Sequence, residues 1–151
     1  MLHDEIWQYR LPMLRLAASI LHHPQNAEDA VSAAMLHALQ KCAGLRDLSA
    51  LKPWLMQITA RCAYDLLRRE KRDKQNQPPI EYVLFPDVEG TLFAQLSRLP
   101  KKCAQVLTLY YYEGFDTREI ARVLGISPTT VRMRMSRGRK QLKAILEEEE
   151  A

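Results

Sequence analysis

Glycine and cysteine are scarce in this sequence, and runs of β-branched residues are missing. Five of its 151 residues are glycine and three are cysteine. Few glycines and no β-branched runs favour helices over strands, so we expect an all-α fold. The cysteines, Cys42, Cys62 and Cys103, are odd in number and have no CxxC spacing. This is typical of small reduced thiols in a cytosolic protein and excludes a disulfide framework.

Long apolar segments are missing as well. No stretch approaches the roughly 18 apolar residues that a membrane helix needs, and the opening MLHDEIWQYR has no apolar signal core. We therefore expect a cytoplasmic protein without membrane insertion. Hydrophobic residues nevertheless make up 47% of the chain, enough to bury the core of one ordinary domain or of two small ones.

The sequence shows no arrangement of side chains for catalysis or metal binding. No nucleophile has a paired base, no glycine-rich loop is placed to hold phosphate, and no carboxylates pair as general acid and base. His3, His22, His23 and His37 lack the spacing and the accompanying ligands of a metal site. We predict that the protein is not an enzyme and needs neither a metal nor a cofactor.

Helical periodicity is clear in the first half of the chain. Apolar residues at 11, 14, 17, 18 and 21 predict one amphipathic helix. A second helix is predicted to begin at Asn26, which can cap it, and to end at Gly44 in a left-handed conformation. Glu28 and Asp29 would lie in its first turn, at the positive end of the helix dipole. A third is predicted near Pro53, and its buried stripe comprises Leu55, Ile58, Cys62 and Leu66.

The periodicity then fails between residues 73 and 90, a segment with three prolines and many polar residues. Such a composition is typical of a linker. We therefore predict two small helical domains, at residues 1–73 and 91–151, joined by a flexible linker at 74–90. The glutamates that end the second domain are most simply a solvated end.

The segment DTREIARVLGISPTTVRMRMSRGRKQL has the start and stop signals of a helix-turn-helix. Asp116 and Glu119 have the spacing of a capping box, and Gly125 permits the left-handed turn that ends the first helix. Ser127 can cap the next helix, with Pro128 at its first position. The helix-turn-helix is the interpretation that we favour over an incidental helical hairpin.

The second helix of this motif has two faces. Val131, Met135, Gly138 and Leu142 form the face that packs on the first helix. Six basic residues and no acidic one lie between Arg132 and Lys143, whereas a merely solvated surface usually mixes both signs. Because the major groove accepts a helix, we predict duplex-DNA contacts by Thr129, Thr130, Arg132, Met133, Ser136, Arg137 and Lys140.

Two parts of the chain together resemble a known family. NAEDAVSAAMLHAL with PWLMQITARCAYDLLRREKR resembles the second conserved region of bacterial sigma factors, and LSRLPKKCAQVLTLYYYEGF with the helix-turn-helix resembles their fourth. Two such regions and a linker are similar to the extracytoplasmic-function (group IV) sigma factors of the sigma-70 family. The resemblance covers roughly residues 10 to 146.

The resemblance implies a sigma factor that binds core RNA polymerase and promoter DNA, reading the −35 duplex with the helix-turn-helix and the melted −10 strand with the first domain. It assigns polymerase binding to Glu28, Asp29 and Val31. It assigns the −10 strand to the loop before the WL motif, the helix that follows and the basic helix end: Arg46, Ser49, Leu51, Trp54, Arg61, Arg68, Arg69 and Arg72.

Some positions leave alternatives open. Trp54 could be a core residue or a platform for a base, and Tyr110 to Tyr112 are expected to lie mainly in the core. Ser32, Ala33 and Arg61 depart from the family pattern, which puts polymerase contact and −10 preference in doubt. Gly138 replaces the usual alanine and should cost its helix up to ~1 kcal/mol.

No self-masking segment is evident, so by family analogy we expect an anti-sigma protein that binds both domains. Two other functions remain: a stand-alone helix-turn-helix regulator, and a sigma-like decoy that binds an anti-sigma factor.

Overall fold

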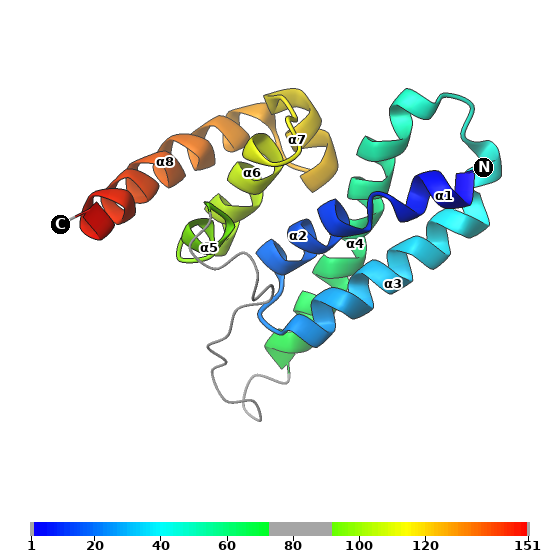
Figure 1. The fold of residues 1–151 in the computed structure, drawn as a ribbon, viewed down its shortest axis with the longest axis horizontal. Helices are drawn as coiled ribbons and strands as arrows, with labels where there is room; N and C mark the ends of the chain where they lie inside the picture. The colour runs from blue at the N-terminus through cyan, green and yellow to red at the C-terminus, as the bar shows by residue number, and fades with distance from the viewer. Residues whose placement is uncertain (1, 73–91, 151) are drawn as a thin grey trace. The chain divides into compact units, whose positions relative to one another are not determined.

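The computed structural model describes residues 2–72 and 92–150, which form eight α-helices and two short 3-10 helices, with no β-strand among them (Figure 1). The all-α prediction is confirmed. The chain separates into two compact units, Met1–Ile80 and Glu81–Ala151. The predicted linker at residues 74–90 lies outside the described residues.

The first unit contains four α-helices: α1 (Leu2–Trp7), α2 (Arg10–Ile20), α3 (Pro24–Lys41) and α4 (Leu51–Arg72). Two 3-10 turns, Cys42–Gly44 and Leu48–Ala50, connect α3 to α4. The helices α2, α3 and α4 pack against one another in all three pairings. Their core is fully enclosed and includes Met13, Leu16, Ile20, Leu55 and Met56.

The predicted ends of α3 were wrong at both termini. The helix begins at Pro24, so Asn26 is not its cap, and Glu28 and Asp29 fall after the first turn. The Asn26 amide instead donates to Glu70 of α4. Gly44 has no positive φ, because the chain leaves α3 at Lys41 through a 3-10 turn.

The buried face of α4 is wider than one predicted stripe. Leu55 and Ile58 are buried as predicted, but Cys62 is only half-buried, as is Leu66. Because α4 packs on both α2 and α3, its middle also buries Met56, Thr59, Ala60 and Ala63. Burial, and then the charge of Asp65, raises the pKa of the Cys62 thiol, which keeps the thiol neutral at pH 7.

Leu11 is likewise not part of the core, since its side chain is 50% exposed. It is the second residue of α2, and the buried residues of this helix begin at Met13. Of the predicted stripe, Leu14, Ala17, Ala18 and Leu21 are buried. The amphipathic helix was therefore predicted correctly, except at its first turn.

The second unit contains α5 (Leu92–Leu96), α6 (Lys101–Tyr111), α7 (Thr117–Leu124) and α8 (Pro128–Glu150). The long α8 packs on the other three helices. Its terminal glutamates are exposed but not merely solvated. Arg98 lies 3.4 Å from Glu148 and 3.3 Å from Glu149, and Gln95 donates to Glu149 at 2.8 Å. Such exposed pairs each contribute at most about 1 kcal/mol.

Gly138 lies where α8 packs closely against α6. A Cβ at this position would lie 2.8 Å from Leu107 Cδ1 and 3.1 Å from Cys103 Cβ. The end of the Leu107 side chain can rotate away, but the Cys103 Cβ moves only with the α6 backbone. The glycine therefore permits the close packing of α8 on α6.

We expect Gly138→Ala to lower the free energy of unfolding. The gain in helix propensity is about 1 kcal/mol, whereas overpacking a close helix contact costs about 1–3 kcal/mol. The net loss should be about 1 kcal/mol, measurable by urea denaturation. In a Leu107→Ala background, where one of the two contacts is gone, the same substitution should cost less. A stabilised Gly138→Ala single variant would contradict the close contact.

Candidate nucleic-acid interface

The turn between α7 and α8 has the predicted geometry. Glu119 N donates to Asp116 Oδ1 at 2.9 Å, and Asp116 N donates to Glu119 Oε1 at 3.0 Å, which completes the capping box. Gly125 ends α7 with φ of 70°. Thr130 N donates to Ser127 Oγ at 3.1 Å at the start of α8. These local bonds fix the angle at which α8 leaves the turn.

The two predicted faces of α8 are also confirmed. Its buried residues are Val131, Met135, Gly138 and Leu142. The opposite face is open to solvent: Thr129, Arg132, Met133, Ser136, Arg137 and Lys140 are exposed, and Thr130 is half-buried. Met133 has 51% of its surface exposed, an apolar group at the centre of a basic face.

Two hydroxyl groups at the start of α8 are already engaged. Thr130 Oγ1 lies 2.8 Å from Ser127 Oγ, and Thr129 Oγ1 accepts from Arg132 Nη2 at 3.3 Å. The second bond holds the Arg132 guanidinium beside the N-terminal turn. Arg137 and Lys140 make no hydrogen bond or ion pair with any residue that the structure describes. Their charged ends are therefore available to a ligand.

A tyrosine pair beside α8 was missed by the sequence analysis. Tyr110 and Tyr111 were expected in the core, but they are 39% and 43% exposed at the end of α6. Arg139 of α8 lies over the Tyr110 ring, 5.1 Å from its centroid, and its Nε donates to Tyr111 Oη at 3.4 Å. The position of Arg139 at the edge of the packed face of α8 was the feature of the sequence that could have indicated this contact.

In the first unit, the loop before α4 is held by a short hydrogen-bonded turn. Asp47 Oδ1 accepts from Ser49 N at 3.0 Å and from Ser49 Oγ at 2.8 Å, and these bonds lower the pKa of Asp47. Arg46 and Ser49 are exposed, and Trp54 is half-buried. Leu51 is 1% exposed, so its side chain belongs to the core and offers no surface to a ligand in this structure.

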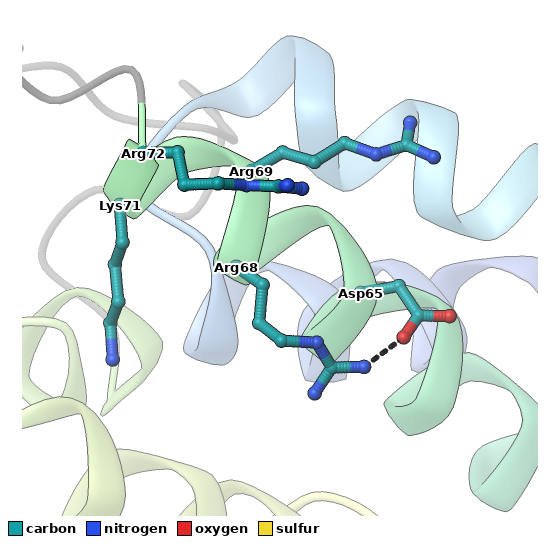
Figure 2. A pocket seen from close by; sticks show the side chains of 5 residues that line it. All are labelled: Asp65, Arg68, Arg69, Lys71 and Arg72. Carbon is teal, nitrogen blue, oxygen red and sulfur yellow. Dashed lines mark hydrogen bonds and ion pairs between the residues drawn. The ribbon is translucent and has the colours of Figure 1, made fainter.

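The C-terminal end of α4 is strongly basic. Arg61 is exposed in the middle of the helix, and at its end the exposed residues are Arg68, Arg69, Lys71 and Arg72. The last four, with Asp65, line an open hollow of about 610 Å³ (Figure 2). Asp65 forms an ion pair with Arg68. Figure 2 shows Arg69 and Arg72 extending in a similar direction, while Lys71 points away from them.

Glu70 lies within this basic run, but its side chain is buried and points toward the start of α3. It is 7% exposed, and its carboxylate accepts from the backbone N–H groups of His22 and His23 and from the Asn26 amide. The sequence analysis did not single it out. In the sequence, its role could be suspected only from the fact that it is a single acidic residue in a run of basic ones.

The α3 residues assigned to polymerase binding have different environments. Glu28 and Asp29 are exposed, and Asp29 Oδ1 accepts from Gln25 Nε2 at 3.0 Å. Val31 is only 2% exposed and packs in the core. The atypical residues Ser32 and Ala33 are both exposed on the same helix.

Two further expectations were that the chain has no metal site and no membrane-spanning helix. Over residues 2–72 and 92–150, no cluster of histidine, cysteine or carboxylate side chains could hold a metal ion. Within the same part of the chain, no helix is long and apolar enough to cross a membrane.

The two units match two regions of one family. Residues 6–73 match Sigma-70 region 2, and residues 90–142 match Sigma-70, region 4. The fold also resembles the sigma factor RpoE of Bartonella quintana, solved in complex with the anti-sigma factor NepR. The TM-score is 0.77 over 95% of both chains at 24% identity, a likeness in fold alone.

Similar curated proteins extend the match along the chain. The chain is 30% identical to the probable RNA polymerase sigma factor RfaY of Xanthomonas campestris, covering 85% of this chain but 36% of that protein. It is 26% identical to SigM of Bacillus subtilis, covering 94% of this chain and 93% of that one. With SigM of Mycobacterium tuberculosis it shares 31% identity over 87% of this chain and 70% of the relative. The chain therefore belongs to the extracytoplasmic-function sigma factors of the sigma-70 family, which direct RNA polymerase to promoters.

Proposed function

We propose that α8 reads the −35 element as duplex DNA. The observation that carries this proposal is the division of α8 into a packed face and an exposed face with arginine, lysine and one methionine. Arg132 and Arg137 can bond guanine edges, and Met133 can touch a thymine methyl group. Thr129, Thr130, Ser136 and Lys140 are placed to contact nearby bases or phosphates, which position the helix on the duplex.

The first unit is proposed to hold the melted −10 strand. Arg46, Ser49, Trp54 and Arg61 would surround an extruded base, because a protein surface must replace the stacking that the base loses. Arg68, Arg69 and Arg72 would bind phosphates from the hollow at the end of α4. Leu51 is buried, so we assign it the support of the loop and not a contact with the strand.

Polymerase binding is proposed for the exposed side of α3. Glu28 and Asp29 are exposed and can meet a basic surface, whereas Val31 acts through the packing of the helix. Ser32 and Ala33 lie on the same helix without charge, so Glu28 and Asp29 carry the acidic part of this contact. The protein would work in the cytoplasm with the polymerase and would perform no chemistry itself.

An anti-sigma partner is part of the proposal. The similar sigma factors RpoE and CnrH were solved in complex with the anti-sigma factor NepR and with the cytosolic domain of CnrY, respectively. An inhibitor that covers α3 in one unit and α8 in the other would block both polymerase and DNA.

The proposed function is tested by mixing the purified protein with core RNA polymerase and a library of promoters. We expect melted promoter complexes at a defined subset of sequences, and none with core polymerase alone. Duplex binding without polymerase would instead indicate a stand-alone regulator. Capture of an anti-sigma factor without promoter melting would indicate a decoy.

A further inference from the structure

Glu70 joins two surfaces that the proposed function assigns to different ligands. It lies on α4 between Arg69 and Lys71, in the basic cluster proposed for the −10 strand. Its carboxylate reaches the start of α3, the helix proposed to contact polymerase. In Figure 1 the C-terminal end of α4 lies beside the start of α3.

The contacts of Glu70 use both carboxylate oxygens. Oε1 accepts from Asn26 Nδ2 at 2.8 Å and from the N–H groups of His22 and His23 at 3.3 Å, and Oε2 accepts from His22 N at 3.2 Å. The bond from Asn26 is short, and the three contacts from the backbone are longer and therefore weaker. The carboxylate also faces the positive end of the α3 dipole.

The N-cap residue of α3 does not cap the helix with its side chain. The N-cap position is occupied by His23, whose side chain makes no capping bond, and Pro24 at the first position has no N–H. The acceptor is supplied by a residue 47 positions away in sequence from His23. The start of α3 is therefore hydrogen-bonded to the end of α4.

This arrangement also determines the charge that α4 presents. An exposed Glu70 would add a negative charge beside the arginines and reduce the attraction of this surface for phosphate. Turned inward, it leaves Arg69, Lys71 and Arg72 exposed, and Asp65 is the acid that lines the hollow with them. One side chain thus stabilises the corner of the unit and keeps its surface basic.

We propose that Glu70 is a positioning residue that holds the polymerase-docking start of α3 in fixed register with the strand-binding end of α4. The inference rests on the proposed function, because it assigns the two surfaces to polymerase and to the −10 strand. The step that depends on this register is promoter melting, in which both surfaces are engaged at once.

The test compares Glu70→Ala, Glu70→Gln and Asn26→Ala in the full chain with core polymerase. For Glu70→Ala we expect faster amide exchange at His22 and His23 and roughly tenfold less promoter melting. Affinity for core polymerase should change less than about twofold, since Glu28 and Asp29 remain, and the −35 preference should not change. Glu70→Gln keeps one acceptor oxygen, and Asn26→Ala removes one donor. Promoter melting by each of these variants should therefore lie between that of Glu70→Ala and that of the unaltered protein.

Ile6→Val is the matched control, because it removes one buried methyl group from α1, which in Figure 1 lies away from the start of α3 and the end of α4. All measurements are made at a temperature where circular dichroism shows every variant to be folded. Unchanged promoter melting by Glu70→Ala would overturn the inference. An equal loss of melting in Ile6→Val would also overturn it, because reduced stability would then explain the loss in both variants. If the unaltered protein melts no promoter, the proposed function has failed and the inference fails with it; amide exchange still reports whether the bridge forms.

Discussion

Replacing Arg137 with alanine should relax one base preference within the −35 element at a cost of about 1–3 kcal/mol, or roughly 5- to 150-fold. Arg137 is exposed on the face of α8 opposite the packed residues. Its guanidinium has no partner among the described residues, so DNA binding does not require breaking an existing bond. The measurement is promoter melting by the holoenzyme on templates with each −35 base pair changed in turn.

Lys140→Ala is the matched control for Arg137→Ala, because both remove one exposed cation from the same helix. A lysine that neutralises phosphate should lower affinity evenly over all templates and make the salt dependence shallower by about one unit of slope. Both variants should unfold within about 0.5 kcal/mol of the unaltered protein, as is usual for surface substitutions. An unchanged −35 preference in Arg137→Ala would remove this residue from the base-reading set.

The helix-turn-helix could be predicted almost residue by residue because its signals are local. The capping box of Asp116 and Glu119, the left-handed Gly125 and the Ser127 cap each involve residues within a few positions of one another. The face of α8 that packs follows from helical periodicity alone. The structure confirms each of these features.

The first unit was less predictable because distant residues determine its local structure. The start of α3 depends on Glu70, which lies 44 positions after Asn26. No pattern around Asn26 can reveal that its amide is directed at another helix and does not cap its own. At Gly44 the chain forms a 3-10 turn in place of the predicted left-handed residue.

The candidate site was predictable in charge but not in exposure. A run of arginines indicates a basic surface wherever it lies on a helix, and Arg68, Arg69 and Arg72 are indeed exposed. The family resemblance placed Leu51 and Val31 in binding roles by position, yet the structure buries both. Conversely, Tyr110 and Tyr111 have rings that suggest burial, but they lie at the open end of α6.

Replacing both Arg68 and Arg69 with alanine should weaken promoter melting and flatten its dependence on salt. Each phosphate contact with a single strand contributes about 0.7 to the slope of log K against log salt, so the loss of two contacts should reduce the slope by about 1.4. Arg69 is exposed, and Arg68 has to leave its exposed ion pair with Asp65, which costs at most about 1 kcal/mol. The measurement is the fraction of promoter melted by the holoenzyme over a series of salt concentrations.

The control for Arg68 and Arg69 is the pair Lys41→Ala with Lys102→Ala. These lysines are exposed on α3 and α6, outside the basic end of α4, and their removal lowers the net charge of the chain by the same amount. If overall charge determined binding, both double variants would flatten the slope equally. If the end of α4 holds the phosphates of the melted strand, only the arginine variant will do so. An unaltered salt slope in the arginine variant would show that this end of α4 does not hold the phosphates of the melted strand.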